Sequence, residues 1–251
     1  MPLFERLTTI IMAAWLALGM CLGQEPVKLL QLNKLSKTVN ALPRIAHPNR
    51  AEVKINRAFN KFDVRARGIA DYCKGLSEQG DEMFFERSID ITSQGPQFLS
   101  MEVNEETNCG GVHAYFQRFT LTYDLRNGEQ VQWAHFLTHG TAKEVTVSPR
   151  DGVFDDLPGV RSLTLQKLYI AGWKNEGRCH IENVFDPTDE TGENLTDFQL
   201  SPAPHESGLS VLPANLPSVD EECALPVILG KSAMEELGIP EDLQKRLASE
   251  Q

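Results

Sequence analysis

Apolar and polar side chains alternate along much of the chain between residues 82 and 133, and this pattern restricts the fold more than any other feature. Three stretches carry the alternation: Met83–Ile91, Leu99–Val103 and Tyr115–Leu125. A period of two is typical of a strand with one buried face and one face in water. Asn127-Gly128 then predicts a hairpin turn that returns into residues 130–133. We therefore expect a three- or four-stranded antiparallel meander with one wet face.

A helical pattern comes directly before this meander. From Ala51 to Tyr72 the apolar residues recur mostly at helical spacing, at Val53, Ile55, Ala58, Phe59, Phe62, Ile69 and Tyr72. Asn49 is suited to cap the start of the helix, and Gly75 is suited to end it. A helix followed by a meander predicts an α+β fold in which helices cover one face of the sheet.

The second half of the chain is less regular. Helices are expected over residues 163–173, 232–237 and 241–248, with short strands near 198–200 and 209–212. Pro213, Pro217 and Pro226 argue against long central strands there. Leu29–Val39 suits a short helix. We expect residues 24–41 to form a polar lead-in and residues 42–251 a single α+β domain.

The N-terminus has the pattern of a secretory signal peptide. Arg6 precedes an apolar run from Leu7 to Leu18, and Gly23 is placed for cleavage before Gln24. Residues 1–23 are thus expected to be removed, which leaves a periplasmic or secreted protein without membrane insertion. A retained N-terminal anchor is one alternative. A lipoprotein cysteine at Cys21 is another, but Met20 stands where such sites need a small residue.

Four cysteines remain once this leader is removed. An even number in an oxidising compartment predicts two disulfides. We favour Cys73–Cys109 and Cys179–Cys223, since each pair joins neighbouring segments of one half of the chain, although three connectivities are possible. A zinc site is the other use of cysteines, but no two of them lie within a few residues of each other. We expect no metal and no cofactor.

The formal charge of −11 narrows the range of partners. An acidic protein repels nucleic acid and anionic membrane surfaces, and it attracts cationic partners. Solubility alone also accounts for such a surface.

The stretch Leu99–Leu137 carries a resemblance to a known family. It holds a strand, Cys109-Gly110-Gly111-Val112-His113, a long strand ending Tyr123-Asp124-Leu125, the Asn127-Gly128 turn and Trp133-Ala134-His135-Phe136-Leu137. The pattern resembles the bacterial envelope domain of unknown function shared by RsiV-type lysozyme-sensing anti-sigma factors and the N-terminal region of PdaC-type peptidoglycan deacetylases. Segments on both sides also resemble this family, so the resemblance covers roughly residues 42–230. Val112 replaces the usual alanine, and His135 stands where an acidic residue is common.

This resemblance implies an α+β fold and a role at the cell envelope, but it supplies no reaction. The candidate ligand-binding residues are the Gly110, Gly111 and His113 loop with the nearby Glu102, Glu105 and Glu106. For the glycines and the histidine, a structural role is the alternative: glycine tolerates a tight loop before a strand, and His113 could hold that loop by a hydrogen bond.

Catalytic motifs find little support in the sequence. Gly110-Gly111 lacks the lysine of a P-loop, and there is no nucleophile elbow. His135 and His139 would share one helix face as a metal pair, but no glutamate lies between them. The acidic pairs Asp155-Asp156 and Glu105-Glu106 fall in apparent polar loops, and Trp133 and Trp173 suit packing better than sugar stacking. We name no catalytic residue.

The sequence thus favours a non-catalytic envelope domain that binds a protein or a cell-wall ligand. By the resemblance, a cationic lysozyme-like protein is the most concrete partner. A peptidoglycan-modifying enzyme and a structural envelope subunit remain the alternatives.

Overall fold

The computed structural model describes residues 25–77, 83–109, 114–139, 142–148, 156–173, 195–203, 206–216 and 223–249. The predicted leader lies outside these residues. The described part is a mixed α+β fold with three antiparallel sheets. Its first half contains β1 (Leu29–Leu30), β2 (Arg44–Ile45), α2 (Arg50–Ser77), β3 (Phe84–Gln94), β4 (Phe98–Asn108), β5 (Tyr115–Asp124) and β6 (Glu129–Gln130). The second half contains η1 (Trp133–Phe136), β7 (Lys143–Val147), β8 (Leu157–Arg161), α3 (Leu163–Gly172), β9 (Asp197–Pro202), β10 (Leu209–Ala214), β11 (Val227–Leu229), α4 (Lys231–Glu236) and α5 (Glu241–Ala248).

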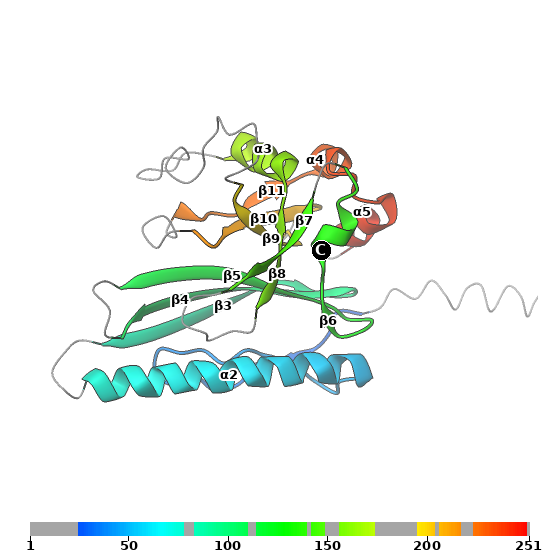
Figure 1. Cartoon of the computed structure of the whole chain (residues 1–251). Helices are drawn as coiled ribbons and strands as arrows, with labels where there is room; N and C mark the ends of the chain where they lie inside the picture. The colour runs from blue at the N-terminus through cyan, green and yellow to red at the C-terminus, as the bar shows by residue number, and fades with distance from the viewer. Residues whose placement is uncertain are drawn as a thin grey trace, which may run out of the picture.

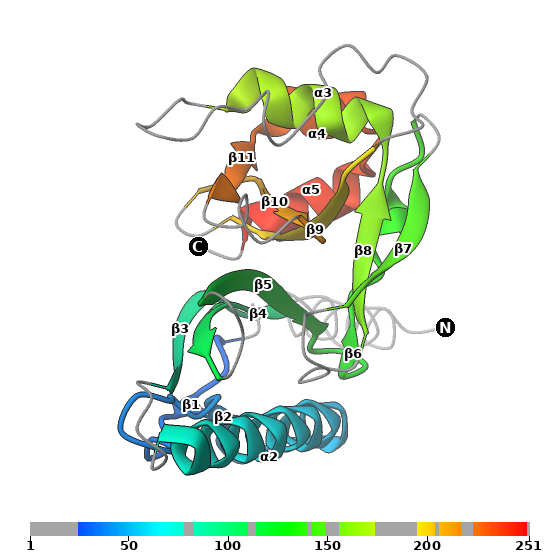
Figure 2. The same cartoon turned by 60° about the vertical axis from the view of Figure 1, so that its left-hand side comes forward.

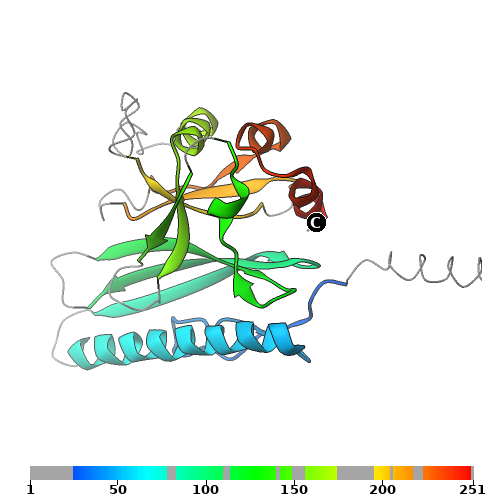
Figure 3. The same ribbon diagram turned by 45° about the vertical axis from the view of Figure 1, so that its right-hand side comes forward.

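Four layers follow one another through the molecule (Figures 1 and 3). Helix α2 forms one outer layer, the sheet β3-β4-β5-β6 lies on it, the sheet β11-β10-β9-β8-β7 follows, and α3, α4 and α5 form the far side. The predicted fold class is therefore confirmed. Among the described residues, no helix is both long enough and apolar enough to cross a membrane.

Helix α2 begins where its capping residue predicts. The Asn49 side-chain oxygen accepts hydrogen bonds from the amides of Ala51 at 2.8 Å and Glu52 at 3.1 Å, while the Glu52 carboxylate accepts from the Asn49 amide at 2.7 Å. This reciprocal pair satisfies amides that the first helical turn leaves free. The predicted stop at Gly75 is wrong, because the helix continues to Ser77.

The first core lies between α2 and the sheet. Strands β4 and β5 contribute alternate apolar side chains, and α2 contributes a stripe at helical spacing: Leu99, Met101, Val103, Phe119, Leu121 and Tyr123 against Ile55, Phe59 and Phe62. The Phe59 and Tyr123 rings meet edge to face at 5.4 Å between centroids. Two residues assigned to the apolar stripe in the sequence are instead exposed, Val53 at 41% and Tyr72 at 61%.

The opposite face of this sheet corrects the prediction of a wet face. Ser100 and Thr122 are buried there, with their hydroxyl oxygens 2.8 Å apart in a hydrogen bond. Thr120 is buried on the same face, and the second sheet covers all three. The alternation of polar and apolar residues was real, but these hydroxyls face another polar protein surface instead of water.

Gln199 on β9 joins the two sheets at this interface. Its side-chain oxygen accepts a hydrogen bond from the Thr120 amide at 3.0 Å, and its side-chain nitrogen donates to the Thr120 carbonyl at 3.2 Å. Strand β6 pairs with β5 only at Tyr123 and Asp124, so Thr120 lies beyond that ladder. One amide side chain therefore satisfies both backbone groups of a buried residue.

The second sheet was predicted only in part. Helices α3, α4 and α5 and strands β9 and β10 are confirmed close to their expected positions, whereas β7, β8 and β11 were missed. Strand β10 contains Pro213 and pairs with both β9 and β11, so proline did not exclude a central strand here. Pro213 lies beyond Val211, the last residue of β10 that pairs with β11. The predicted helix over Leu29–Val39 is wrong, since this segment contains β1 and bends.

Candidate functional site

Strand β4 carries three of the predicted site residues, and its alternation divides them. Glu102 and Glu106 lie on the face away from α2, whereas Glu105 lies on the face toward α2 and is 1% exposed. The pair Glu105-Glu106, expected in a polar loop, lies within a regular strand instead. Only Glu102 and Glu106 are therefore placed on a face that a ligand can reach.

Glu105 is a buried carboxyl group. Its Oε2 accepts a hydrogen bond from Gln117 Nε2 at 2.6 Å, and its Oε1 has no hydrogen-bond partner among the described residues. Burial raises the pKa of Glu105 to about 7, although the charge of Arg87 and the Gln117 hydrogen bond both lower it. Its carboxyl group is thus poised between its neutral and charged forms near neutral pH.

Arg87 links Glu105 to a second buried carboxylate, Asp63 on α2. Arg87 Nη2 donates to Asp63 Oδ1, and its Nε and Nη2 donate to the Asn40 carbonyl at 2.9 and 2.7 Å. The Asp63 carboxylate also accepts hydrogen bonds from the Leu42 amide at 3.0 Å and from Arg44 Nη2 at 2.7 Å. These contacts fasten residues 40–44 between α2 and β3. The cluster of Arg44, Asp63 and Arg87 is therefore a largely buried structural tie.

The exposed part of the other face has an unfavourable arrangement of charge. In the β3–β4 register, Glu86 stands opposite Glu106 and Asp90 stands opposite Glu102. Like charges directly opposite each other on neighbouring strands destabilise a sheet. Glu102 is relieved by Arg118, whose Nε lies 3.3 Å from its Oε1. In the described part of the chain, no cation lies within 4.0 Å of the other three carboxylates. We call these four residues the acidic ladder.

A pocket of about 360 Å³ lies at one end of the acidic ladder. Its lining includes Glu86 and Glu106 from the ladder, Phe116 from β5, and Lys34 and Lys37 from the segment beside β3. The ladder therefore borders a recess that also offers an aromatic ring. Both ladder residues that line it, Glu86 and Glu106, are exposed.

The loop with the other predicted site residues begins close to this recess. Gly110, Gly111 and His113 lie outside the described residues, so their role stays a prediction. The structure does show the two strand ends that hold this loop, Asn108 of β4 and Tyr115 of β5. Glu106 is two residues before the end of β4, so the acidic ladder reaches the base of the loop.

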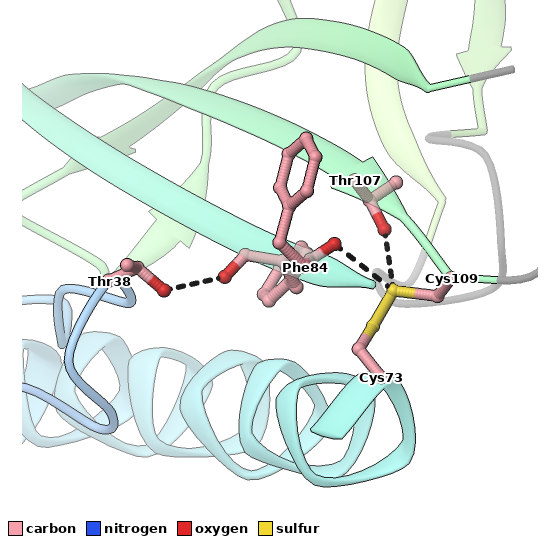
Figure 4. Close-up of a disulfide and its surroundings, with 6 residues drawn as sticks. Thr38, Cys73, Phe84, Thr107 and Cys109 are labelled. Carbon is pink, nitrogen blue, oxygen red and sulfur yellow. Dashed lines mark hydrogen bonds between the residues drawn. A yellow bond between two sulfur atoms is a disulfide. The ribbon is translucent and has the colours of Figure 1, made fainter. Parts of the chain in front are cut away.

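A disulfide fixes this end of β4 to α2 (Figure 4). Cys73 and Cys109 are bonded as predicted, with their Cα atoms 4.9 Å apart. Cys109 Sγ lies 3.0 Å from Thr107 Oγ1 and 3.2 Å from the Phe84 carbonyl oxygen. Cys223 is also disulfide-bonded, but Cys179 lies outside the described residues, so the second predicted pairing does too.

The described residues assemble no metal site. None of their His, Cys, Asp and Glu side chains form a group of three able to hold an ion. His135 lies on η1 with its Nε2 3.5 Å from Glu144 Oε2, while His139 follows the end of η1 and its Nδ1 lies 3.2 Å from the Glu236 carbonyl oxygen. The two histidines therefore do not share a helix face. Trp133 is buried against Phe98, which agrees with the prediction that it packs in the core.

Sequence reasoning missed Glu86 and Asp90 as site residues. Both occupy the polar positions of the β3 alternation, so their face was visible in the sequence. What the alternation could not supply was the register, which decides that each stands opposite a second carboxylate.

Comparison with known proteins finds similarity among solved structures. No family model and no curated protein matches the chain. The crystal structure of a member of the DUF3298 family from Bacteroides fragilis NCTC 9343 is similar, with 11% sequence identity and a TM-score of 0.44 over 90% of this chain and 98% of that chain.

Proposed function

We propose that the protein is a non-catalytic binding domain of a bacterial cell envelope and that its acidic ladder receives a cationic protein. The observation that carries this proposal is the pairing of Glu86 with Glu106 and of Asp90 with Glu102 on the part of this face that the second sheet leaves open. Glu102 is partly buried and paired with Arg118, so the uncompensated charge lies on the other three. A partner that brings lysine or arginine side chains to this face removes the repulsion within the protein and gains attraction across the interface.

Two further features support the location and the partner. Disulfides persist in oxidising compartments, which agrees with the predicted export. The resemblance of Leu99–Leu137 to the lysozyme-sensing domain selects a cationic lysozyme as the first partner to test.

The test measures binding of a cationic lysozyme to the purified protein at low and physiological salt, by calorimetry. E86Q/E106Q should weaken binding at least about tenfold, because close charge pairs at interfaces contribute more than about 1.5 kcal/mol. E206Q/E236Q makes the same change of charge at exposed positions outside the ladder and should alter affinity less than about twofold. Lysozyme with acetylated lysines should bind weakly to all three proteins.

Two results would overturn the proposal. One is the absence of salt-sensitive binding to lysozyme. The other is an equal loss in both double variants, which would show that overall charge and not the ladder determines affinity.

A further inference from the structure

Helix α2 has a charge opposite to that of the rest of the protein. Its 28 residues contain seven Lys and Arg residues and three Asp and Glu residues, which gives a net charge of +4. The whole chain has 24 basic and 35 acidic residues, so the remainder carries 17 minus 32, or −15. One of the three acids of α2, Asp63, is buried and paired with Arg44 and Arg87. Asp71 is exposed on the outer side of the helix, but the exposed basic residues outnumber it, so the exposed surface of α2 is basic.

The basic residues gather on the outer side of α2. At 100° per residue, Arg57, Lys61 and Arg67 lie within about 60° of a line through Val64, opposite the stripe that faces the sheet. Arg57, Lys61, Arg67 and Lys74 are exposed, and none makes an ion pair or a side-chain hydrogen bond with the described part of the chain. Figure 2 shows α2 as the outermost layer below the sheet, with no labelled element on its outer side.

Large apolar side chains are exposed on the same helix. Val53 is 41% exposed, and Val64 and Tyr72 are each 61% exposed. Six large apolar residues are at least 38% exposed in the described part of the chain, and α2 carries three of them. A solvated helix face gains nothing from these side chains, whereas the interface of a lipid bilayer accommodates both them and the cations.

We propose that the outer face of α2 docks on a bilayer surface that contains anionic lipids. The basic side chains contact the headgroups, and Val53, Val64 and Tyr72 enter the interfacial region. From Arg50 to Lys74 the contact is about 36 Å long, at about 1.5 Å per residue. Among the described residues, no helix spans the bilayer in this arrangement.

The acidic remainder does not prevent this docking. Screening at physiological salt reduces the influence of charges beyond about 8 Å. The first sheet separates α2 from the second sheet, and stacked sheets are about 10 Å apart. A surface in contact with α2 therefore responds mainly to the helix. Docking also directs the acidic ladder, on the opposite face of the first sheet, away from the bilayer.

A linear polyanion is the rival occupant of a basic helix. Phosphate or sulfate groups along a polymer use the cations but gain nothing from exposed valine and tyrosine side chains. The presence of three such side chains among the cations therefore favours lipid.

The experiment is co-sedimentation of the full chain with vesicles of phosphatidylcholine alone or mixed with phosphatidylglycerol. We expect tighter binding to the anionic vesicles. R57Q/K61Q/R67Q/K74Q should reduce that binding at least about tenfold, because each basic residue near an anionic surface contributes several-fold. K143Q/K167Q/K231Q/K245Q removes the same charge from exposed positions elsewhere and should change binding less than about twofold. The apolar run Leu7–Leu18 is identical in all three proteins, so its contribution cancels.

A second variant and a second probe separate lipid from polyanion. V64Q/Y72Q should weaken vesicle binding and leave binding to linear polyphosphate unchanged. Circular dichroism of each variant verifies that the fold is retained, and Gln is chosen because it forms helices well. No preference for anionic vesicles, equal losses in the two quadruple variants, or a loss confined to polyphosphate would each overturn the proposal. Lysozyme binding is a separate readout, so failure here leaves the proposed function standing.

Discussion

The two faces of the first sheet use the same type of residue in opposite ways. On the face toward α2, Glu105 and Asp63 are buried, and arginine and glutamine side chains surround them. On the other face, Glu86 and Glu106 stand exposed and opposite each other, with no cation within 4.0 Å among the described residues. One face thus contains compensated charge and the other contains charge that the protein leaves uncompensated.

This difference indicates which carboxylates serve the fold and which are available to a partner. A buried carboxylate is either matched within the protein, as Asp63 is, or shifted toward its neutral form, as Glu105 is, because an isolated buried charge is costly. An exposed pair of like charges costs little enough to be retained, and a partner can relieve it. The three predictions below test this division in order of decreasing effect.

Arg87→Met should cause the largest loss of stability. It removes the cation that contacts Asp63 and neighbours Glu105, and it leaves these buried carboxylates less compensated. Removing one partner of a buried ion pair costs about 3–5 kcal/mol. Urea unfolding measures the loss. Arg67→Met, on the exposed side of α2, should change stability by less than about 0.5 kcal/mol. A loss below about 1 kcal/mol for Arg87→Met would contradict the structural role of the cluster.

Glu105 should make stability depend on pH near neutrality. Its folded pKa of about 7 lies above the ordinary value of 4.5, so the folded state holds a proton that the unfolded state has already lost between these values. The contribution is fully present below about pH 4.5 and falls as the pH rises through about 7. The two pKa values imply a change of about 3 kcal/mol.

Glu105→Gln should therefore remove this decline. Urea unfolding at pH 5 and pH 8 should show a smaller difference than in the unaltered protein, with a gain in stability at pH 8. Glu106→Gln, one residue away on the exposed face, should keep the full decline. Identical pH profiles for Glu105→Gln and the unaltered protein would show that Glu105 is not the titrating group.

Glu86→Gln should give the smallest effect, and its sign is the informative part. It removes one charge of the Glu86 and Glu106 pair, so stability should rise by about 0.2–1 kcal/mol. Thermal unfolding at low salt measures this gain, which should shrink as salt increases. A loss of stability at low salt would mean that Glu86 has a stabilising contact and that the face is not a strained one.

Much of the first half of the fold was readable from residue spacing. Asn49 marked the start of α2, and the alternation of Phe119, Leu121 and Tyr123 assigned the buried face of β5. These signals are local, so they need no knowledge of the rest of the chain. The second sheet was harder because β7, β8 and β11 are short and lack a long alternating pattern.

The errors at the candidate site have two different physical causes. Thr120, Thr122 and Ser100 were expected in water because they are polar, yet a second polar surface covers them. Glu105 was expected beside Glu106 at a contact zone, but adjacent residues on a strand point to opposite faces. A sequence shows which residues share a face, but it does not show what that face meets.

The contact between Gln199 and Thr120 has a consequence for the behaviour of the protein at high concentration. Beyond its pairing with β6, strand β5 has an open edge at Thr120. Without Gln199, the Thr120 amide and carbonyl would be free to pair with an extended segment of another molecule. Such edges are where chains add to one another and begin to aggregate. Because Gln199 of the second sheet bonds both groups, this part of the β5 edge cannot pair with a strand of another molecule, although β6 is short.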